Sequence, residues 1–306
     1  MPRTPDPLDL VRRRLGGSVR TLLAGDVAPD TPAFPVATAD DPGWFGPGSA
    51  TWQVHGDLSM IVGGLRALLL QTLHPLAMAG VADHSDYRDD PFGRLHRTGG
   101  FVAATTYGDS AAAARAVDMV RRVHVRVRGT APDGRPYSAS DPHLVTWVHV
   151  TEVDSFLAAH RRYGTRPISP ADADRYVAEM AQVCEALGGD DPPRDVAALR
   201  AWIDGVRPEL AVGRQARDAV RFLIAPPVPL VARGPYAVIS AAAVGLLPAW
   251  ARRKLWLPSA PLADPLVVRP AARALLAGLG WALGPPPHRT AAESASIEPA
   301  AAGAAG

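Results

Sequence analysis

Apolar residues recur at helical spacing through most of the chain between residues 58 and 285. The segment 59–80 is almost continuously apolar, which predicts a buried helix. Pro75 interrupts this segment, because proline removes a backbone N–H and clashes with the preceding turn. The other predicted helices span residues 110–128, 141–163, 169–187, 195–206, 208–224, 233–247 and 264–283. The pairs Asp141-Pro142 and Ser169-Pro170 provide a cap and a first-turn proline for two of them.

Strand signals are few, and the two ends of the chain are irregular. Residues 126–137 are typical of a small hairpin closed by Asp133-Gly134. Near the start, 8–23 predicts one amphipathic helix and 28–48 an extended arm. The last 20 residues cannot bury much apolar area, so we expect them to be disordered.

These patterns predict an all-α protein with one small hairpin. Between about 58 and 285 the sequence has no internal repeat and no change of composition that would mark a linker. We therefore expect an N-terminal arm with one helix (1–57), a single large bundle-like helical domain (58–285) and a tail (286–306).

Composition supports a sizeable core and excludes several classes of protein. Of the 306 residues, 47% are hydrophobic, and the formal net charge of +2 gives no electrostatic footprint for nucleic acid. Cys184 is the only cysteine, which excludes an intrachain disulfide, a cysteine-based zinc site and an iron–sulfur cluster. No secretory signal is visible, and the apolar run 236–250 is shorter than the roughly 20 residues of a membrane span. We expect a cytoplasmic protein without a transmembrane segment.

The motifs of common enzyme classes are missing. There is no Gly-x-Gly-x-x-Gly after a strand, no P-loop, no His-Glu-x-x-His, no Glu-x-x-His and no Gly-x-Ser-x-Gly. The nine histidines are the richest chemical resource of the chain. This leaves histidine-based metal or haem chemistry.

His124 is the first candidate ligand. With Ala113, Val117, Val120 and Val127 it forms one apolar stripe of the helix 110–128, which places it on a buried face. A neutral imidazole on such a face is what an axial iron ligand requires. The alternative is a core histidine that hydrogen-bonds to a carbonyl.

His74 precedes the proline that interrupts the helix 59–80. A kink there frees carbonyl groups and can open a pocket, which makes His74 a candidate for cofactor binding. In the alternative interpretation, the imidazole satisfies one of the freed carbonyls inside a kinked core helix.

A third candidate region is the polar stretch 83–100. Arg94 and Arg97 are three residues apart, so on a helical turn both guanidinium groups face one side and suit haem propionates or a phosphate. His84 and Thr98 are candidate hydrogen-bond donors in the same stretch. Alternatively, this stretch is a solvated loop whose arginines pair with Asp86, Asp89 and Asp90.

Four pieces of the chain, in order, resemble one known family. They are LLLQTLHPLAMAGVADHS, DPFGRLHRT, VRRVHVRVRG and PYSASDPHLVTWVHV, within about residues 63–163. This run is similar to the catalytic domain shared by rubber oxygenases (latex-clearing proteins) and the fungal membrane-bound MpaB oxygenase of mycophenolic acid biosynthesis. The resemblance covers about a third of the chain clearly.

The resemblance implies an all-helical fold around a buried, non-covalently bound haem b, with iron as the metal. It also implies oxygenase chemistry with dioxygen, such as oxidative cleavage of an isoprenoid double bond. His124 matches the axial haem ligand of the family, and Arg94, Arg97 and Thr98 match its Arg-x-x-basic-Thr motif. His74 is retained as a second candidate for contact with the cofactor.

Two positions depart from the rubber oxygenase pattern. Arg97 stands where those enzymes have lysine, and arginine cannot lose its proton to approach iron. No glutamate precedes Glu152, so the upstream glutamate base of those enzymes is missing. Asp57, Asp83, Asp86 or His84 are candidate substitutes.

We therefore predict a haem b-dependent oxygenase that cleaves or hydroxylates a small apolar substrate, with isoprenoid-like molecules as one candidate class. Thr98 or His84 would donate a hydrogen bond to dioxygen. The residues predicted to shape the substrate pocket lie beside the proline kink: Leu73, Leu76, Met78 and Val81. The alternatives are a haem carrier or sensor, and a non-catalytic helical protein that binds an apolar ligand or partner.

One further segment bears on membranes. Residues 228–247 and 250–257 are apolar and include Trp250, Trp256 and the basic run 252–254, a combination that can mark an interfacial anchor. The alternative is an ordinary buried helix followed by an exposed basic turn.

Overall fold

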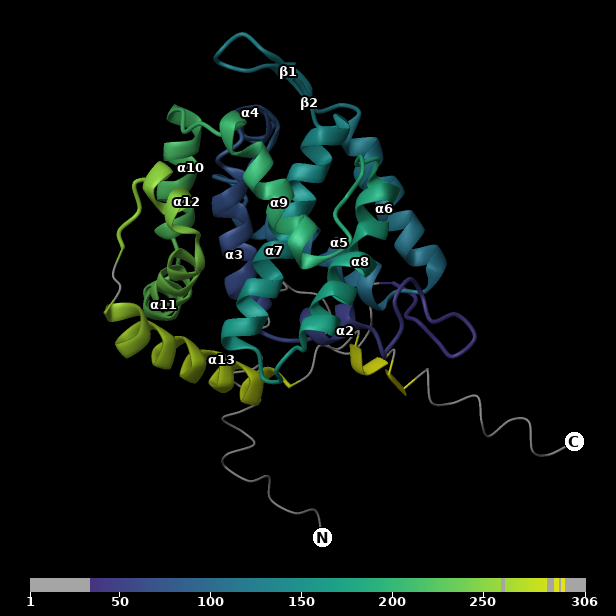
Figure 1. Cartoon of the computed structure of the whole chain (residues 1–306). Helices are drawn as coiled ribbons and strands as arrows, with labels where there is room; N and C mark the ends of the chain where they lie inside the picture. The colour runs from purple at the N-terminus through teal and green to yellow at the C-terminus, as the bar shows by residue number, and fades with distance from the viewer. Residues whose placement is uncertain (1–33, 260–261, 285–288, 292, 295–306) are drawn as a thin grey trace, which may run out of the picture. The chain divides into compact units, whose positions relative to one another are not determined.

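The computed structural model describes residues 34–259, 262–284, 289–291 and 293–294, and within these ranges the regular secondary structure is helical apart from one small hairpin and one isolated bridge. The all-α prediction is confirmed. The elements are α2 (Ala50–His55), α3 (Met60–Gln71), α4 (Pro75–His84), α5 (Pro91–Tyr107), α6 (Ser110–His124), β1 (Arg128–Thr130), β2 (Pro136–Ser138), α7 (Pro142–Tyr163), α8 (Pro170–Leu187), α9 (Val196–Val206), η1 (Arg207–Glu209), α10 (Arg214–Ile224), α11 (Leu230–Leu246), α12 (Ala249–Lys254), η2 (Asp264–Val268) and α13 (Arg269–Leu283) (Figure 1).

The chain divides into two compact units. Unit 1 includes the described residues among 34–48, 86–116 and from 274 onward, and unit 2 comprises residues 49–85 and the described residues among 117–273. The predicted helix 8–23 and most of the predicted tail lie outside the described residues. The predicted boundaries of arm, domain and tail stay a prediction.

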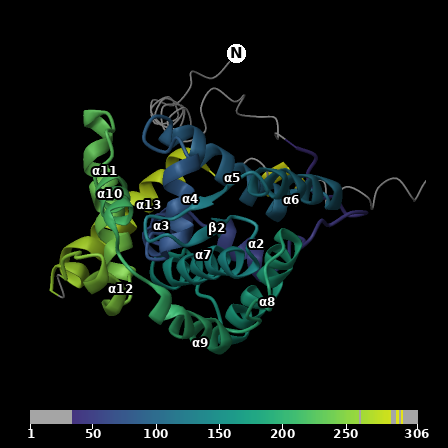
Figure 2. The same cartoon turned by 90° about the horizontal axis from the view of Figure 1, so that it is seen from above.

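Unit 2 is built around helices α3 and α7, which lie side by side at its centre (Figures 1 and 2). Helices α10 and α11 cover α3, while α8 and α9 cover α7. A Cβ added at Gly63 in α3 would lie 2.8 Å from Phe156 Cδ1 in α7, so only glycine permits this close approach.

A buried charged side chain ties three helices of this core together. Arg66 in α3 is 3% exposed and forms an ion pair of 2.7 Å with Asp154 in α7. The same guanidinium donates to Ser155 Oγ (2.7 Å) and to the carbonyl of Leu246 in α11 (3.0 Å). These bonds compensate for much of the cost of burying its charge.

The predicted break at Pro75 is sharper than a kink. The axes of α3 and α4 differ by 106°, and His74 lies at the break with an extended backbone as the N-cap of α4. Pro75 takes the first position of the new helix, where its missing N–H costs nothing.

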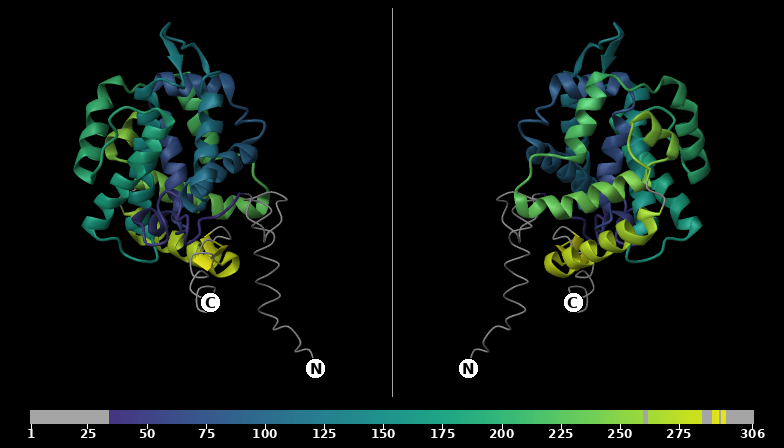
Figure 3. Two further views of the ribbon diagram at one scale, coloured as in Figure 1. Left: turned by 90° about the vertical axis from the view of Figure 1, so that its right-hand side faces the viewer. Right: turned by 90° about the vertical axis from the view of Figure 1, so that its left-hand side faces the viewer.

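The predicted hairpin is confirmed. Strands β1 and β2 pair antiparallel in the register Gly129↔Tyr137, and Gly134 in the turn has a positive φ of 87°. The hairpin projects from the end of unit 2 at which α4 lies (Figure 3). Tyr137 and the α4 residue Ala79 are buried together, with Leu76 packed against them.

Several helix boundaries differ from the prediction. α6 ends at His124 rather than continuing to 128, where the chain turns into β1. The predicted helix 208–224 is wrong at its start, because a 3₁₀ turn, η1, is followed by a non-helical stretch before α10 begins at Arg214. The polar stretch 83–100 is not a loop, since most of it forms the start of α5, capped by Asp90.

In unit 1, residues 34–48 are irregular, as predicted for this arm, and are fastened to the connection between α5 and α6. Ala37 N–H donates to the carbonyl of Tyr107 (2.8 Å). Both the backbone and the side chain of Ser110 donate to the carboxylate of Asp41, which lowers the pKa of this group.

One helical segment, Asp264–Leu283, has 20 residues with a mean hydropathy of 1.3 and could cross a membrane by length and composition. The bent pair α3 and α4 passes the same criterion, but its α3 half forms the core of unit 2. The absence of a transmembrane segment therefore stays a prediction.

Candidate functional site

His74 occupies a buried position where two helices meet at a sharp angle. Its side chain is 1% exposed, and among the described residues neither ring nitrogen has a hydrogen-bond partner. The carbonyl-satisfying role considered from the sequence is therefore wrong. Burial lowers the pKa of His74, so the imidazole is neutral at pH 7.

His143 approaches from the first turn of α7. Pro142 begins this helix, and the Asp141 side chain caps it by accepting from the His143 N–H at 2.9 Å. The His143 side chain is 46% exposed. One turn along the same face, Trp147 is fully buried and its ring lies 6.0 Å from that of His74.

Glu209 approaches from η1, the 3₁₀ turn after α9. Two bonds hold the backbone that follows it: Ala211 N–H donates to the carbonyl of Leu73 (2.9 Å), and Lys254 Nζ donates to the carbonyl of Leu210 (2.9 Å). The first of these bonds joins η1 directly to the residue that precedes His74. The position of Glu209 relative to His74 is thus set by backbone contacts.

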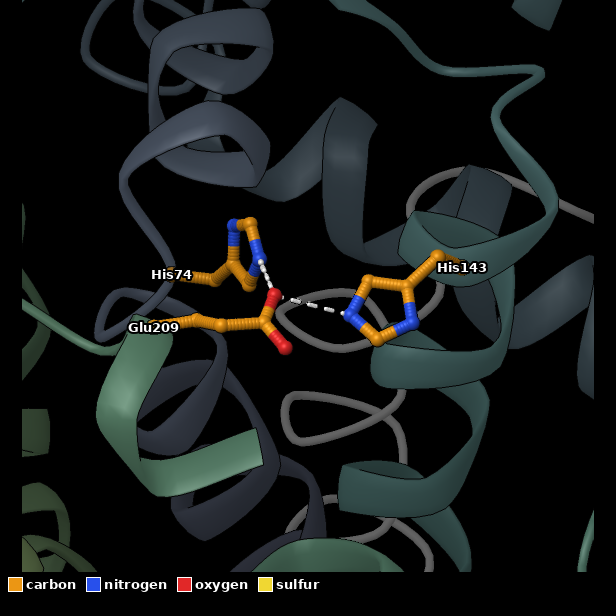
Figure 4. Close-up of side chains that lie close together, drawn as sticks. All are labelled: His74, His143 and Glu209. Atoms are coloured by element: carbon orange, nitrogen blue, oxygen red, sulfur yellow. Dashed lines mark hydrogen bonds and ion pairs between the residues drawn. The ribbon is translucent and has the colours of Figure 1, made fainter. Parts of the chain in front are cut away.

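The three side chains converge in unit 2 (Figure 4). Glu209 Oε2 accepts a hydrogen bond from His143 Nε2 at 2.9 Å and lies 3.5 Å from His74 Nε2, in ion-pair range. The two imidazole rings are 6.2 Å apart at a 64° angle. The carboxylate opposes the effect of burial on His74, while His143 and Arg135 lower the pKa of His74 further.

Aromatic rings line the cluster. Trp202 in α9 lies 5.4 Å from the ring of His143 and stacks on Trp147 at 6.4 Å. The cluster is therefore polar at its centre and lined by indole rings. It is open to solvent at His143 and Glu209, whose side chains are partly exposed.

A second set of polar side chains is buried in unit 2. His55 Nε2 is 3.1 Å from the hydroxyl of Tyr176, and burial lowers the pKa of His55 to about 3. Nearby in α7, burial raises the pKa of Glu152 to about 7 and lowers that of His149 to about 4. At neutral pH these histidines are uncharged and Glu152 can hold a proton.

His124 is the last residue of α6 and is half-buried, so the predicted fully buried stripe does not reach it. Earlier residues of the stripe, Ala113 and Val117, are buried as expected. Burial still lowers the pKa of His124, and its Nδ1 is inaccessible to solvent with no hydrogen-bond partner in the described part of the chain. This imidazole is uncharged at neutral pH, as an iron ligand must be, and other atoms of the chain cover its Nδ1.

The arginines of the polar stretch lie on α5 in unit 1. Arg94 is half-buried, and burial lowers its pKa. Arg97 is 67% exposed and lies 3.5 Å from Asp90, so part of the surface-pairing alternative holds. Thr98 is exposed and its hydroxyl donates to the carbonyl of Arg94 at 3.0 Å.

His84 does not join the His74 cluster. It ends α4, is exposed, and its Nε2 lies 3.3 Å from the carbonyl of Arg128 in the hairpin. Its ring also packs at 6.1 Å from Tyr137. Within unit 2 the predicted candidates His74, His84 and His124 are therefore held in different surroundings.

A shallow cleft of about 400 Å³ lies elsewhere in unit 2, on α7 and α9. Three arginines line it, Arg161, Arg162 and Arg200, which makes it a poor match for an apolar substrate. The residues predicted to shape an apolar pocket instead pack inward: Leu73 and Met78 are buried, and Leu76 lies against the hairpin.

Sequence reasoning missed two of the three clustered residues, His143 and Glu209. His143 stood within a quoted family piece without being assigned a role, and Glu209 is 66 residues further along the chain. The Asp-Pro-His start of α7 was the only local signal, because nothing in the sequence shows that η1 folds back onto the α3–α4 break.

Comparison with known proteins finds one family and two relatives. Residues 52–281 match the family described as ER-bound oxygenase mpaB/B'/Rubber oxygenase, catalytic domain. The chain is 30% identical over 162 residues to uncharacterised proteins of Mycobacterium bovis (Mb2261) and Mycobacterium tuberculosis (Rv2237), covering 50% of this chain and 62% of theirs. The chain therefore spans about three fifths of the length of these relatives. No solved structure matches.

Proposed function

Because this chain belongs to the mpaB/rubber oxygenase catalytic-domain family, we propose that it is a haem b-dependent oxygenase. It would act with dioxygen on a small apolar substrate, for which isoprenoid-like molecules are one class, by cleavage or hydroxylation. The match covers residues 52–281 and so includes every candidate ligand discussed above. Family membership supports the oxygenase-type activity, and the activity, the haem and the substrate together are the proposal.

The observation that carries the haem proposal is the state of His124. An axial ligand must be a neutral imidazole with a free nitrogen. Burial lowers the pKa of His124, and its buried Nδ1 has no partner in the described part of the chain. The residue therefore fits the ligand role, and when bound the haem would supply the oxidation chemistry.

The basic residues of α5 support anion binding. Arg94 and Arg97 lie one turn apart on this helix, and Arg94 is half-buried although it carries a charge. A guanidinium can donate paired hydrogen bonds to a carboxylate, such as a haem propionate. Arg97 keeps its proton under all ordinary conditions, so it can donate hydrogen bonds but cannot act as a base.

A spectroscopic experiment separates an oxygenase from a haem carrier. The purified, haem-loaded protein is reduced, and its spectrum is recorded before and after addition of carbon monoxide. We expect a shift of the Soret band, because an oxygenase must leave one axial position of the iron open for a diatomic ligand. Dioxygen uptake is then measured with farnesol as an isoprenoid probe.

The outcomes are distinct. A shift supports an iron that can bind dioxygen. A haem protein whose spectrum does not change with carbon monoxide has both axial positions filled, which would replace the oxygenase proposal with a carrier or electron-transfer role.

A further inference from the structure

Three potential metal ligands meet in unit 2 although they come from separate segments of the chain. One ligand atom from each of His74, His143 and Glu209 lies within 4.8 Å of the other two (Figure 4). We propose that this cluster, the His74–Glu209 site, binds a divalent first-row transition-metal ion. None of its three ligands is the proposed haem ligand His124.

The donor set defines the class of ion. Two imidazole nitrogens and one carboxylate oxygen suit Zn²⁺, Fe²⁺ or Co²⁺, whereas Mg²⁺ and Ca²⁺ prefer oxygen donors throughout. Three protein ligands leave at least one coordination position for water or a small ligand. This arrangement is typical of reactive metal centres rather than of closed structural sites.

The observed spacing is compatible with such an ion. Metal–ligand bonds of about 2.0–2.2 Å place neighbouring ligand atoms of a tetrahedral site about 3.4 Å apart. The two imidazole nitrogens lie 2.9 Å and 3.5 Å from Glu209 Oε2, on either side of this value. Small side-chain movements would therefore bring the three atoms around a common centre.

The protein contacts of His74, the buried member of the cluster, leave its ring nitrogens poorly satisfied. His74 is 1% exposed; its Nδ1 has no hydrogen-bond partner among the described residues, and its Nε2 has only the 3.5 Å contact with Glu209 Oε2, which is longer than the 2.9 Å bond from His143. A buried ring nitrogen without a partner is unfavourable. A metal ion at this position would bind Nε2 and pair with the charge of Glu209.

Access and rigidity also fit a metal site. The side chains of His143 and Glu209 are 46% and 44% exposed, so an ion can enter from solvent. The bond between Ala211 N–H and the Leu73 carbonyl (2.9 Å) keeps η1 against the α3–α4 break without the ion. The ligands are thus largely pre-positioned, which lowers the entropic cost of binding.

The test is a Co²⁺ titration of the full-length, tag-free protein after treatment with a chelator. Visible absorption of Co²⁺ reports coordination by protein ligands. We expect about one equivalent bound per chain by the wild type. Glu209→Gln and His143→Gln remove one ligand each from partly exposed positions, and each is expected to weaken Co²⁺ binding by about 100-fold or more.

Glu185→Gln is the matched control, because the Glu185 side chain is 45% exposed and lies outside the cluster. It is expected to bind Co²⁺ like the wild type. Absence of Co²⁺ binding by the wild type would overturn the proposal. Binding by Glu209→Gln as tight as that of Glu185→Gln would overturn it equally, since the ion would then be held elsewhere.

Haem content measured on the same samples keeps this proposal apart from the proposed function. Glu209→Gln is expected to lose Co²⁺ binding but retain haem. His124→Ala is expected to lose haem but retain Co²⁺ binding. A protein that binds Co²⁺ through Glu209 but takes up no haem would support the metal site and refute the haem proposal alone.

Discussion

At the scale of single residues, Glu152 shows how packing changes the acid–base behaviour of a side chain. It lies in α7, where burial raises its pKa to about 7 from an ordinary value of 4.5. Its charge is close enough to raise the pKa of Tyr176, whose hydroxyl contacts His55. The folded protein therefore holds a proton that the unfolded chain releases.

The contribution of this proton to the free energy of unfolding depends on pH. Between about pH 4.5 and pH 7 the native state binds the Glu152 proton and the unfolded state does not, so the contribution of this group falls as the pH rises. Glu152→Gln stays neutral throughout. We predict that at pH 8 the variant is more stable than the wild type by about 1–3 kcal/mol, and that this difference largely disappears near pH 4.5.

Urea unfolding at the two pH values measures this difference. His55 and His149 also titrate differently on folding, but they are present in both proteins and their effects cancel. Glu185→Gln, at an exposed position, controls for the loss of a surface charge. Equal stability differences at both pH values would show that Glu152 does not carry the proton.

At the scale of elements, the candidate metal ligands all lie where a helix begins or ends. His74 caps α4, His143 is in the first turn of α7, and Glu209 ends η1. Proline sets two of these boundaries, at Pro75 and Pro142, because it suits the first helical turn and not the interior. The break between α3 and α4 that places His74 beside Glu209 is thus determined by the local sequence.

The close approach of α3 and α7 supplies a prediction with a built-in control. A Cβ at Gly63 would lie 2.8 Å from Phe156 Cδ1, whereas a Cβ at Gly64 would lie 3.9 Å from Phe156 Cε1, an ordinary contact. Gly64→Ala should stabilise the protein by up to about 1 kcal/mol, because alanine favours the helix. Gly63→Ala should destabilise it by about 1–3 kcal/mol, because the core is overpacked.

Chemical denaturation of the two variants measures these changes. The opposite signs are the important result, since both substitutions add the same methyl group to the same helix. If Gly63→Ala were as stable as Gly64→Ala, the tight packing of α3 on Phe156 would be contradicted.

At the scale of the whole molecule, the family and the all-α class could be predicted from the sequence. The cluster of His74, His143 and Glu209 could not. Periodicity and Pro-containing caps predicted α7, α8 and α9 closely, because these signals are local. The whole of α5 was missed, since Pro91, Gly93 and the charged residues of its first half resemble a loop. The cluster depends on contacts between distant segments, such as Ala211 with Leu73, that no local pattern encodes.

The two proposed centres, the haem site and the His74–Glu209 site, use different residues. The haem proposal rests on His124, while the metal proposal rests on His74, His143 and Glu209. Family membership supports the oxygenase activity and says nothing about the His74–Glu209 site.

The most direct test of the central claim is the haem content of the purified protein, expressed with a haem precursor and measured as the pyridine haemochrome. We predict about one haem b per wild-type chain, loss of most of it in His124→Ala, and retention in Glu209→Gln. A colourless wild-type protein that also fails to take up added haemin would contradict the cofactor, the ligand and the proposed reaction together.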